Sequence, residues 1–245
     1  MAESAPPPSH LFYQTRDRRP MVDRAEGIYL WDVDGRRYID GCSGAMVSNI
    51  GHSNPRVLAA MQAQMERATF AYRLHFENAP AETLAARTAA LMPGDLDRVF
   101  FVSGGSEAVE SCIKLARQYA LAVGQGQRCK VISRYPSYHG STMGALGLTG
   151  YTPMTAPFAP MLQLSPQIPS PTVYLDRGVR SEEDAGRHYA DLLEAEILRQ
   201  GPETVLAFIM EPVGGASTGA LVAPDSYYPR IRSICDRYGV LLIHD

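Results

Sequence analysis

The chain has 245 residues, of which 45% are hydrophobic, and its formal net charge is −3. This length can enclose one sizeable core, whereas the interspersed charges and the lack of a long apolar run argue against nucleic-acid and membrane partners. The first 20 residues lack the apolar core of a signal peptide, and the 4 cysteines form no C-x-x-C pair, so we expect reduced cysteines in a cytoplasmic protein without a metal site.

The N-terminal segment predicts an arm followed by a β-hairpin. Residues 1–20 contain three consecutive prolines and favour an extended arm whose ordering depends on a partner surface. Residues 28–40 alternate apolar and polar side chains on both sides of an Asp-Gly turn, which is typical of two short antiparallel strands. Trp31 and Tyr38 are the expected packing residues of this hairpin.

Two helices are predicted to follow. Asn54 and the proline after it are typical of a helix start, and Met61 and Met65 share an apolar face that we expect to lie in the core. A second helix begins near Asn78 and is stopped at Pro93.

Beyond residue 98, apolar runs typical of buried strands alternate with helical patterns. Two helices are indicated by apolar stripes, one through Leu193 that ends at Gly201 and one through Ile231 that begins at Asp225. A largely parallel sheet covered by helices on both faces is therefore predicted, in an α/β fold. Residues 151–176 show no clear period and predict an irregular surface excursion. The strand runs are 99–102, 130–133, 205–210 and 240–243.

Polar residues follow each of these four runs. The carboxyl ends of parallel strands meet at one edge of a sheet, where ligands bind in open α/β folds, so the sequence predicts a site there. The four polar segments are 103–106, 138–140, Glu211 and 244–245.

The first of these segments, Ser-Gly-Gly-Ser, lies between an apolar run and a helix. The glycines and the free N–H groups of a first helical turn suit a phosphate, although such a turn can also serve only to cap the helix. The residues match neither a P-loop nor a G-x-G-x-x-G turn. They do read G-x-S-x-A, so Ser106 as the nucleophile of a serine hydrolase is an alternative.

With these residues assembled, the chain resembles the class III, or omega, aminotransferases, which are fold-type I pyridoxal-phosphate enzymes. The resemblance rests on the motifs DVDGRRYIDGCSG, GHSNP, SGGSEAVESCIKLAR, YHG, EPVGG and LLIHD, between Tyr29 and Asp245. It implies the aspartate-aminotransferase-like fold, pyridoxal 5'-phosphate (PLP) as cofactor and a homodimer. It also implies that residues 1–75 belong to the small domain and dimer interface, and that residues 76–245 begin the PLP-binding large domain.

The same resemblance implies roles for individual residues. Gly105 and Ser106 bind the cofactor phosphate, and Tyr138 stacks on the pyridine ring. His139 has a supporting place beside that ring. Asp245 pairs with the pyridine nitrogen and keeps it protonated, so that the ring can accept the electron pair released at the substrate carbon.

Three further residues are placed near the substrate by resemblance. Glu211 lies beside the cofactor and pairs, in many members, with a switchable arginine; a solvated loop carboxylate is the alternative. Ala45 and Met46 correspond to residues that line the substrate pocket. The expected reaction transfers an amino group from an amine or amino acid to a keto acid, and a decarboxylase or aminomutase of the same family remains an alternative.

The lysine that forms the Schiff base in this family is absent from the 245 residues. Lys114 and Lys130 lie in a helix and before a strand, so neither fits that role. We therefore expect a fragment of a longer enzyme, inactive and poorly folded alone because its sheet edge and apolar helix faces lack cover. A non-catalytic remnant is the third alternative. The Ser111-x-x-Lys114 spacing indicates only a helix surface.

Overall fold

The computed structural model describes residues 9–12, 18–176 and 180–245, so most of the predicted N-terminal arm lies outside the described residues. The chain divides into two compact units, Met1–Val99 and Phe100–Asp245. The predicted domain boundary after residue 75 concerns how these segments join a larger enzyme, and it stays a prediction.

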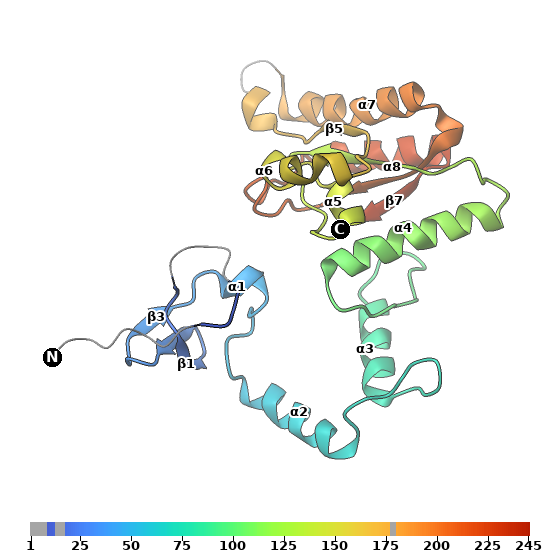
Figure 1. Ribbon diagram of the computed structural model, residues 1–245. Coiled ribbons are helices and arrows are strands. Elements are labelled where there is room, and N and C mark those ends of the chain that lie inside the picture. Colours follow the sequence, from blue (N-terminus) through green and yellow to red (C-terminus); the bar gives the residue numbers. More distant parts are fainter. Residues whose placement is uncertain (1–8, 13–17, 177–179) are drawn as a thin grey trace. The chain divides into compact units, whose positions relative to one another are not determined.

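The first unit contains a three-stranded antiparallel sheet (Figure 1). The predicted hairpin is confirmed, and its turn is held by Asp32, whose carboxylate accepts from the backbone N–H of Arg36 at 2.8 Å and from the Tyr38 hydroxyl at 2.7 Å. The Tyr38 hydrogen bond is the largest of the effects that lower the pKa of Asp32. The strands are β1 Val22–Glu26, β2 Tyr29–Asp32 and β3 Arg37–Ile39.

Three helices complete this unit: α1 Ser43–Met46, α2 Pro55–Arg67 and α3 Ala79–Ala89. Both predicted helix starts are confirmed, because the Asn54 side chain accepts from two N–H groups of the first turn of α2, and Asn78 accepts from one of α3. A side chain that satisfies these N–H groups stabilises a helix start. The second helix ends at Ala89, four residues earlier than Pro93.

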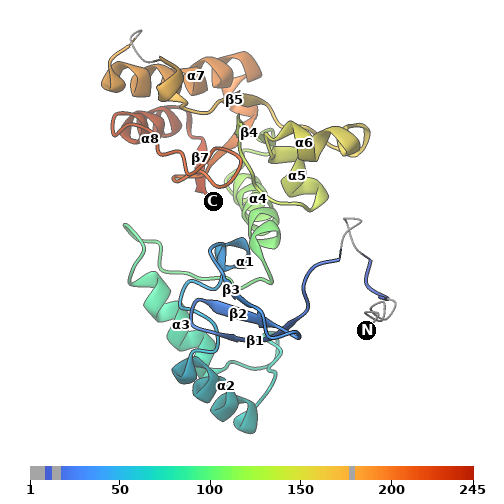
Figure 2. The same ribbon diagram turned by 90° about the vertical axis from the view of Figure 1, so that its left-hand side faces the viewer.

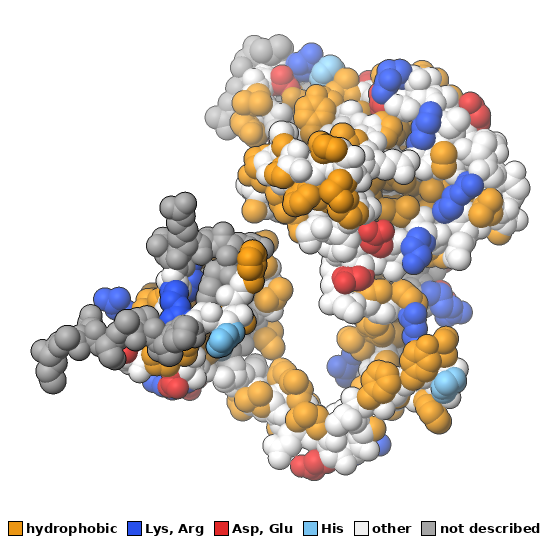
Figure 3. Space-filling view, in the orientation of Figure 1, with side chains coloured by type: hydrophobic (Ala, Val, Ile, Leu, Met, Phe, Trp, Pro, Cys, Tyr) orange, Lys and Arg blue, Asp and Glu red, His pale blue; other side chains and the backbone are white. Residues whose placement is uncertain are grey.

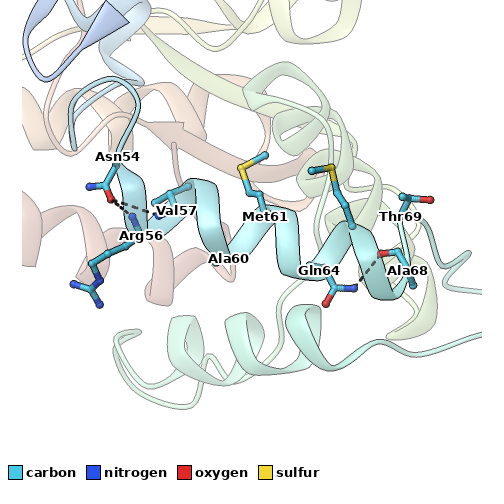
Figure 4. Close-up of a pocket in the computed structure, with 9 residues that line it drawn as sticks. Asn54, Arg56, Val57, Ala60, Met61, Gln64, Ala68 and Thr69 are labelled. Carbon is cyan, nitrogen blue, oxygen red and sulfur yellow. Dashed lines mark hydrogen bonds between the residues drawn. The ribbon is translucent and has the colours of Figure 1, made fainter.

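The expectation that Met61 and Met65 lie in the core is wrong. They are 56% and 57% exposed, and α2 has no buried residue. Figure 4 shows the Met61 side chain projecting from α2, beside a hollow that is lined only by α2 and the residues that flank it. An amphipathic pattern predicts a face that needs cover, but it does not say which segment provides that cover.

The second unit is built on a four-stranded parallel sheet with the strand order β5-β4-β6-β7. All six residues of β6 are buried, and neighbouring side chains point to opposite faces: Phe208 packs in one hydrophobic cluster and Ile209 in the other. The strands are β4 Lys130–Tyr135, β5 Gln167–Pro169, β6 Val205–Met210 and β7 Leu241–His244.

Helices cover both faces of this sheet, as predicted. Helices α7 and α8 pack on one face and α4 and α5 on the other, which Figure 2 shows as separate layers on either side of the strands. The bounds are α4 Gly105–Ala122, α5 Met143–Leu148, α7 Glu182–Gln200 and α8 Tyr227–Tyr238. No helix among the described residues is long and apolar enough to cross a membrane.

The prediction of a strand at residues 99–102 is wrong. This run forms no strand among the described residues, and Phe100 and Phe101 are 59% and 45% exposed. An apolar run reports a tendency toward burial, whereas a strand also needs a second strand to complete its backbone hydrogen bonds.

The segment 151–176 is more ordered than predicted. Its strand β5 pairs in parallel with β4, and three short helical segments lie around it. The strand escaped detection because it is only three residues long and contains a proline, which is tolerated at a sheet edge. The short segments are α6 Thr152–Thr155, η1 Ala156–Met161 and η2 Val173–Asp176.

The packing of α7 against the sheet gives a stability prediction. Leu193 is completely buried in the cluster of α7, α8 and the sheet, whereas Leu198 on the same helix is 55% exposed. Leu193→Ala should lower the free energy of unfolding by about 2–5 kcal/mol through lost burial and a cavity. Leu198→Ala should change it by less than about 0.5 kcal/mol. Urea denaturation of both variants checks this, and equal effects would contradict the packing described.

Candidate functional site

Three polar segments follow strands of the parallel sheet at the same edge. Tyr138 to Gly140 come after β4, Glu211 directly follows β6, and Asp245 directly follows β7. The strands run in the same direction, so their carboxyl ends lie side by side. The structure thus brings together most of the residues that the sequence nominated.

Asp245 is held by His139 across this edge. The His139 Nδ1 and Asp245 Oδ2 atoms are 2.8 Å apart, and the His139 side chain is fully buried while that of Asp245 is 27% exposed. The backbone of Asp245 is fixed as well, because its N–H donates to the Met210 carbonyl at 3.0 Å. One carboxylate oxygen is therefore anchored inside the protein, and the carboxylate stays accessible from the sheet edge.

Helix α4 begins beside these residues. In Figure 1 the C-terminal end of the chain lies next to the N-terminal end of α4. Two hydrogen bonds support this: Ser106 in the first turn of α4 accepts from the Ser141 N–H, and His139, two residues before Ser141, contacts Asp245. The positive end of the helix and the Asp245 carboxylate thus face the same region.

Ser106 connects α4 to the loop after β4. Its Oγ accepts a hydrogen bond from the backbone N–H of Ser141 at 3.0 Å. Because the oxygen serves as the acceptor, the hydroxyl hydrogen remains available to donate to a ligand. The first N–H groups of α4, including those of Gly105 and Ser106, have no acceptor within the helix. This combination is suited to an anion such as a phosphate.

Gly140 allows this close approach. Its φ is +133°, and a Cβ at this position would lie 2.6 Å from Ser106 Oγ and 2.8 Å from the Ala145 Cβ. Only glycine fits between the two. The Tyr138 side chain nearby is 40% exposed, so its ring is available to a ligand rather than packed into the core.

Glu211 is not a solvated loop carboxylate. The residue is 6% exposed; its Oε1 accepts from the Gly215 N–H at 3.4 Å, and its Oε2 is buried without a hydrogen-bond partner among the described residues. Its carbonyl accepts from Arg134 Nη2 at 2.5 Å. A buried carboxylate oxygen without a donor is costly, and a bound group that donates to it would offset that cost.

Ala45 and Met46 lie in the first unit, at the end of α1. Their segment is held locally by Asp40, which accepts from the Ser43 N–H at 2.9 Å and contacts His52 Nε2 at 2.7 Å. Their place in a substrate pocket stays a prediction.

Sequence reasoning missed the residues that hold the loop after β4. Thr149 Oγ1 accepts from the His139 N–H at 2.9 Å, and Glu110 on α4 accepts from the same loop. Neither residue belongs to a polar cluster in the sequence, and only the folded course of the chain brings them to the site. Spacing alone gave no signal for them.

The arrangement gives the serine-hydrolase alternative no base. Among the described residues, no histidine hydrogen-bonds to Ser106: His139 Nδ1 is engaged with Asp245, and its Nε2 is buried without a hydrogen-bond partner. His244 sits at the end of β7, where burial lowers its pKa. A nucleophilic serine needs a general base within hydrogen-bond reach, and that pair is not formed here.

The relatives found by comparison with known proteins are aminotransferases. The sequence pattern of the family described as aminotransferase class-III matches residues 13–245. An uncharacterized aminotransferase of Schizosaccharomyces pombe is 40% identical over 241 residues, which cover 97% of this chain and 52% of that protein. The putrescine–pyruvate aminotransferase of Pseudomonas aeruginosa is 35% identical over 227 residues, covering 92% of this chain and 49% of that protein.

Solved structures give the same picture. An (S)-enantioselective omega-transaminase from Thermomicrobium roseum superimposes with a TM-score of 0.89 at 38% identity, covering 97% of this chain and 54% of that one. The omega transaminase from Pseudomonas jessenii in complex with PMP has a TM-score of 0.89 at 32% identity, with the same coverage of both chains. The chain spans about half the length of the curated relatives it matches.

The close approach at Gly140 gives a second prediction. Gly140→Ala should lower the free energy of unfolding by about 3 kcal/mol, because a methyl group overpacks the contact and the positive φ adds strain. Gly124 also has a positive φ, +75°, but a Cβ added there would meet nothing within 4 Å. Gly124→Ala should therefore cost only about 1 kcal/mol, from the backbone alone. Equal losses in urea denaturation would show that the contact with Ser106 is loose.

Proposed function

Because the chain belongs to the class III aminotransferase family, we propose that it forms part of an enzyme that moves an amino group from a primary amine or amino acid to a keto acid. The family is PLP-dependent. The observation that carries the proposal is the pairing of His139 with Asp245 next to the anion-binding end of α4. The two features match the two ends of PLP, the pyridine nitrogen and the phosphate.

The residues present fit this cofactor. The N–H groups of Gly105 and Ser106 and the Ser106 hydroxyl would hold the phosphate, and the exposed ring of Tyr138 would lie against the pyridine. Glu211 would meet a donor with its unpartnered oxygen. When bound, PLP supplies an electron sink for the bond that breaks at the substrate carbon.

We assign Asp245 the role of holding the pyridine nitrogen of PLP in its protonated form, in which the ring accepts electrons best. A carboxylate close to a ring nitrogen favours the protonated nitrogen, because opposite charges attract strongly away from bulk water. His139 fixes the orientation of the carboxylate by its hydrogen bond to Oδ2. Because the His139 side chain is fully buried, water does not compete for this hydrogen bond.

In this family the amino group that forms the Schiff base with the cofactor comes from a lysine. Neither lysine of this chain is suited to that role. Lys130 begins β4, at the amino end of the sheet, and its Nζ donates to the Gln200 carbonyl at 2.7 Å. Lys114 is exposed on the surface of α4. We infer that residues beyond Asp245 in a longer chain supply the lysine.

The substrate stays open within the amine and keto-acid classes. One relative is a putrescine–pyruvate aminotransferase, so a diamine with pyruvate is a reasonable first pair to test. A decarboxylase or aminomutase of the same family would use the same cofactor seat, and product analysis separates these reactions. A non-catalytic remnant would bind PLP without turnover.

We infer a homodimer in the cytoplasm for the complete enzyme. Figure 3 shows hydrophobic side chains gathered over α5 and α6, and nearby Met161, at the end of η1, and Leu164, which follows η1, are 71% and 57% exposed. Exposed apolar patches of this kind favour a protein interface. The four cysteines lie among the described residues without a disulfide, which suits a reducing compartment. Light scattering of the purified enzyme tests the dimer.

The proposed role of Asp245 gives a third prediction. In the product of the complete reading frame, Asp245→Asn should lower kcat by about 100-fold or more, because the amide carries no charge to keep the nitrogen protonated. The exposed Asp225 provides the control, and Asp225→Asn should leave kcat unchanged. A panel of amines with pyruvate or 2-oxoglutarate, followed by chromatography of the products, measures both.

Two results would contradict the proposal. If the enzyme neither binds PLP nor forms an aminated product from any amine and keto acid of the panel, the proposed aminotransferase activity is wrong, although the chain still belongs to the family. Full activity of Asp245→Asn would show that another group faces the nitrogen.

A further inference from the structure

Glu110 makes a contact that the proposed chemistry does not use. It lies on α4, one turn after Ser106, and its Oε1 accepts from the Thr142 hydroxyl at 2.7 Å and from the Ala145 N–H at 3.2 Å. Both donors belong to the start of α5, in the segment that follows Tyr138 and His139. A half-buried carboxylate on one helix therefore caps another helix.

The Glu110 carboxylate takes the place of the N-cap side chain that would otherwise satisfy the first N–H groups of α5. Thr142 is the N-cap residue of α5, but its side chain makes no capping hydrogen bond to its own helix. Ala145 is the third residue of α5, whose N–H a capping side chain usually satisfies. A negative carboxylate at a positive helix end makes a charge-assisted hydrogen bond, which is stronger than a neutral one.

Ser106 and Glu110 act on the segment together. Residues four apart lie on the same face of a helix, and the two side chains hold Ser141 and Thr142 respectively. A glycine faces each of them. A Cβ at Gly140 would lie 2.6 Å from Ser106 Oγ, and a Cβ at Gly144 would lie 2.6 Å from both carboxylate oxygens of Glu110.

From this geometry we propose that Glu110 is a positioning residue for the cofactor seat. By fixing the start of α5 against α4, it sets where the Tyr138 ring and the His139–Asp245 pair stand relative to the Ser106 hydroxyl. Among the described residues, the Glu110 side chain hydrogen-bonds to Thr142 and Ala145 and to none of the side chains assigned to the cofactor. The inference rests on the proposed function, because it concerns the same seat.

The test compares variants that weaken this contact in steps, in the product of the complete reading frame. Glu110→Ala removes both hydrogen bonds, Glu110→Gln keeps an acceptor oxygen without the charge, and Thr142→Val removes one donor at nearly constant shape. Lys114→Ala is the control, since Lys114 is exposed one turn further along α4.

Titration of each apoenzyme with PLP gives the dissociation constant and the absorption spectrum of the bound cofactor. We expect the PLP dissociation constant of Glu110→Ala to rise about tenfold or more, as for other residues that orient a primary ligand. Glu110→Gln and Thr142→Val should show smaller increases, and Lys114→Ala none. At saturating PLP, kcat should fall in the same order while KM for the amine changes little.

A merely structural role would lower the denaturation midpoint of these variants and leave PLP affinity, spectrum and kcat as in the wild type; that result overturns the inference. If Glu110→Ala does not fold, the test rests on Glu110→Gln and Thr142→Val. Wild-type PLP affinity in both of these variants would overturn the inference. A wild-type enzyme that binds no PLP would overturn the proposed function and this inference together. A working wild type with unaffected variants would overturn this inference alone.

Discussion

Strand β6 is buried along its whole length between β4 and β7, and the parallel pairing of these three strands decides where the polar groups of the candidate site lie. Each strand delivers one segment to the same edge: the Tyr138 loop, Glu211 and Asp245. The hydrogen bond from His139 to Asp245 joins the outer two across the end of the middle one. Apolar packing on both faces of the sheet thus fixes the positions of groups that are themselves polar.

Helix α4 contributes the second half of the site. Its first turn offers unpaired N–H groups, and the side chains of Ser106 and Glu110 hold the loop after β4 against it. A phosphate and a ring nitrogen are recognised by opposite charges, and the structure provides a positive helix end and a negative carboxylate near each other. The fold that carries both features is shared with transaminases of known structure.

The elements that sequence predicted correctly are those whose side chains carry a strong local pattern. The continuous apolar run of β6 and the capping residues Asn54 and Asn78 are examples. Placing the site needed only one general rule, that parallel strands end at a common edge. The resemblance then implied the individual roles, which stay predictions, and it did not foresee the hydrogen bond between His139 and Asp245.

The failures arise where structure depends on a distant partner. Residues 99–102 have the composition of a strand but form none among the described residues, and Met61 has the spacing of a core residue but no cover. Strand β5 was too short to show a period. Thr149 and Glu110 gave no signal because their hydrogen bonds reach across 10 and 32 or more residues of chain.

The two glycines opposite α4 bear on how this sequence can diverge. A Cβ at 140 would meet Ser106 Oγ, the Ala145 Cβ and the Ser106 backbone, whereas the atoms nearest a Cβ at 144 belong to the carboxylate end of Glu110. Position 140 is therefore closed to larger side chains whatever stands at 106, whereas a side chain at 144 becomes possible once the one at 110 moves or shortens. Evolutionary drift is thus coupled between 110 and 144, while 140 stays fixed as glycine.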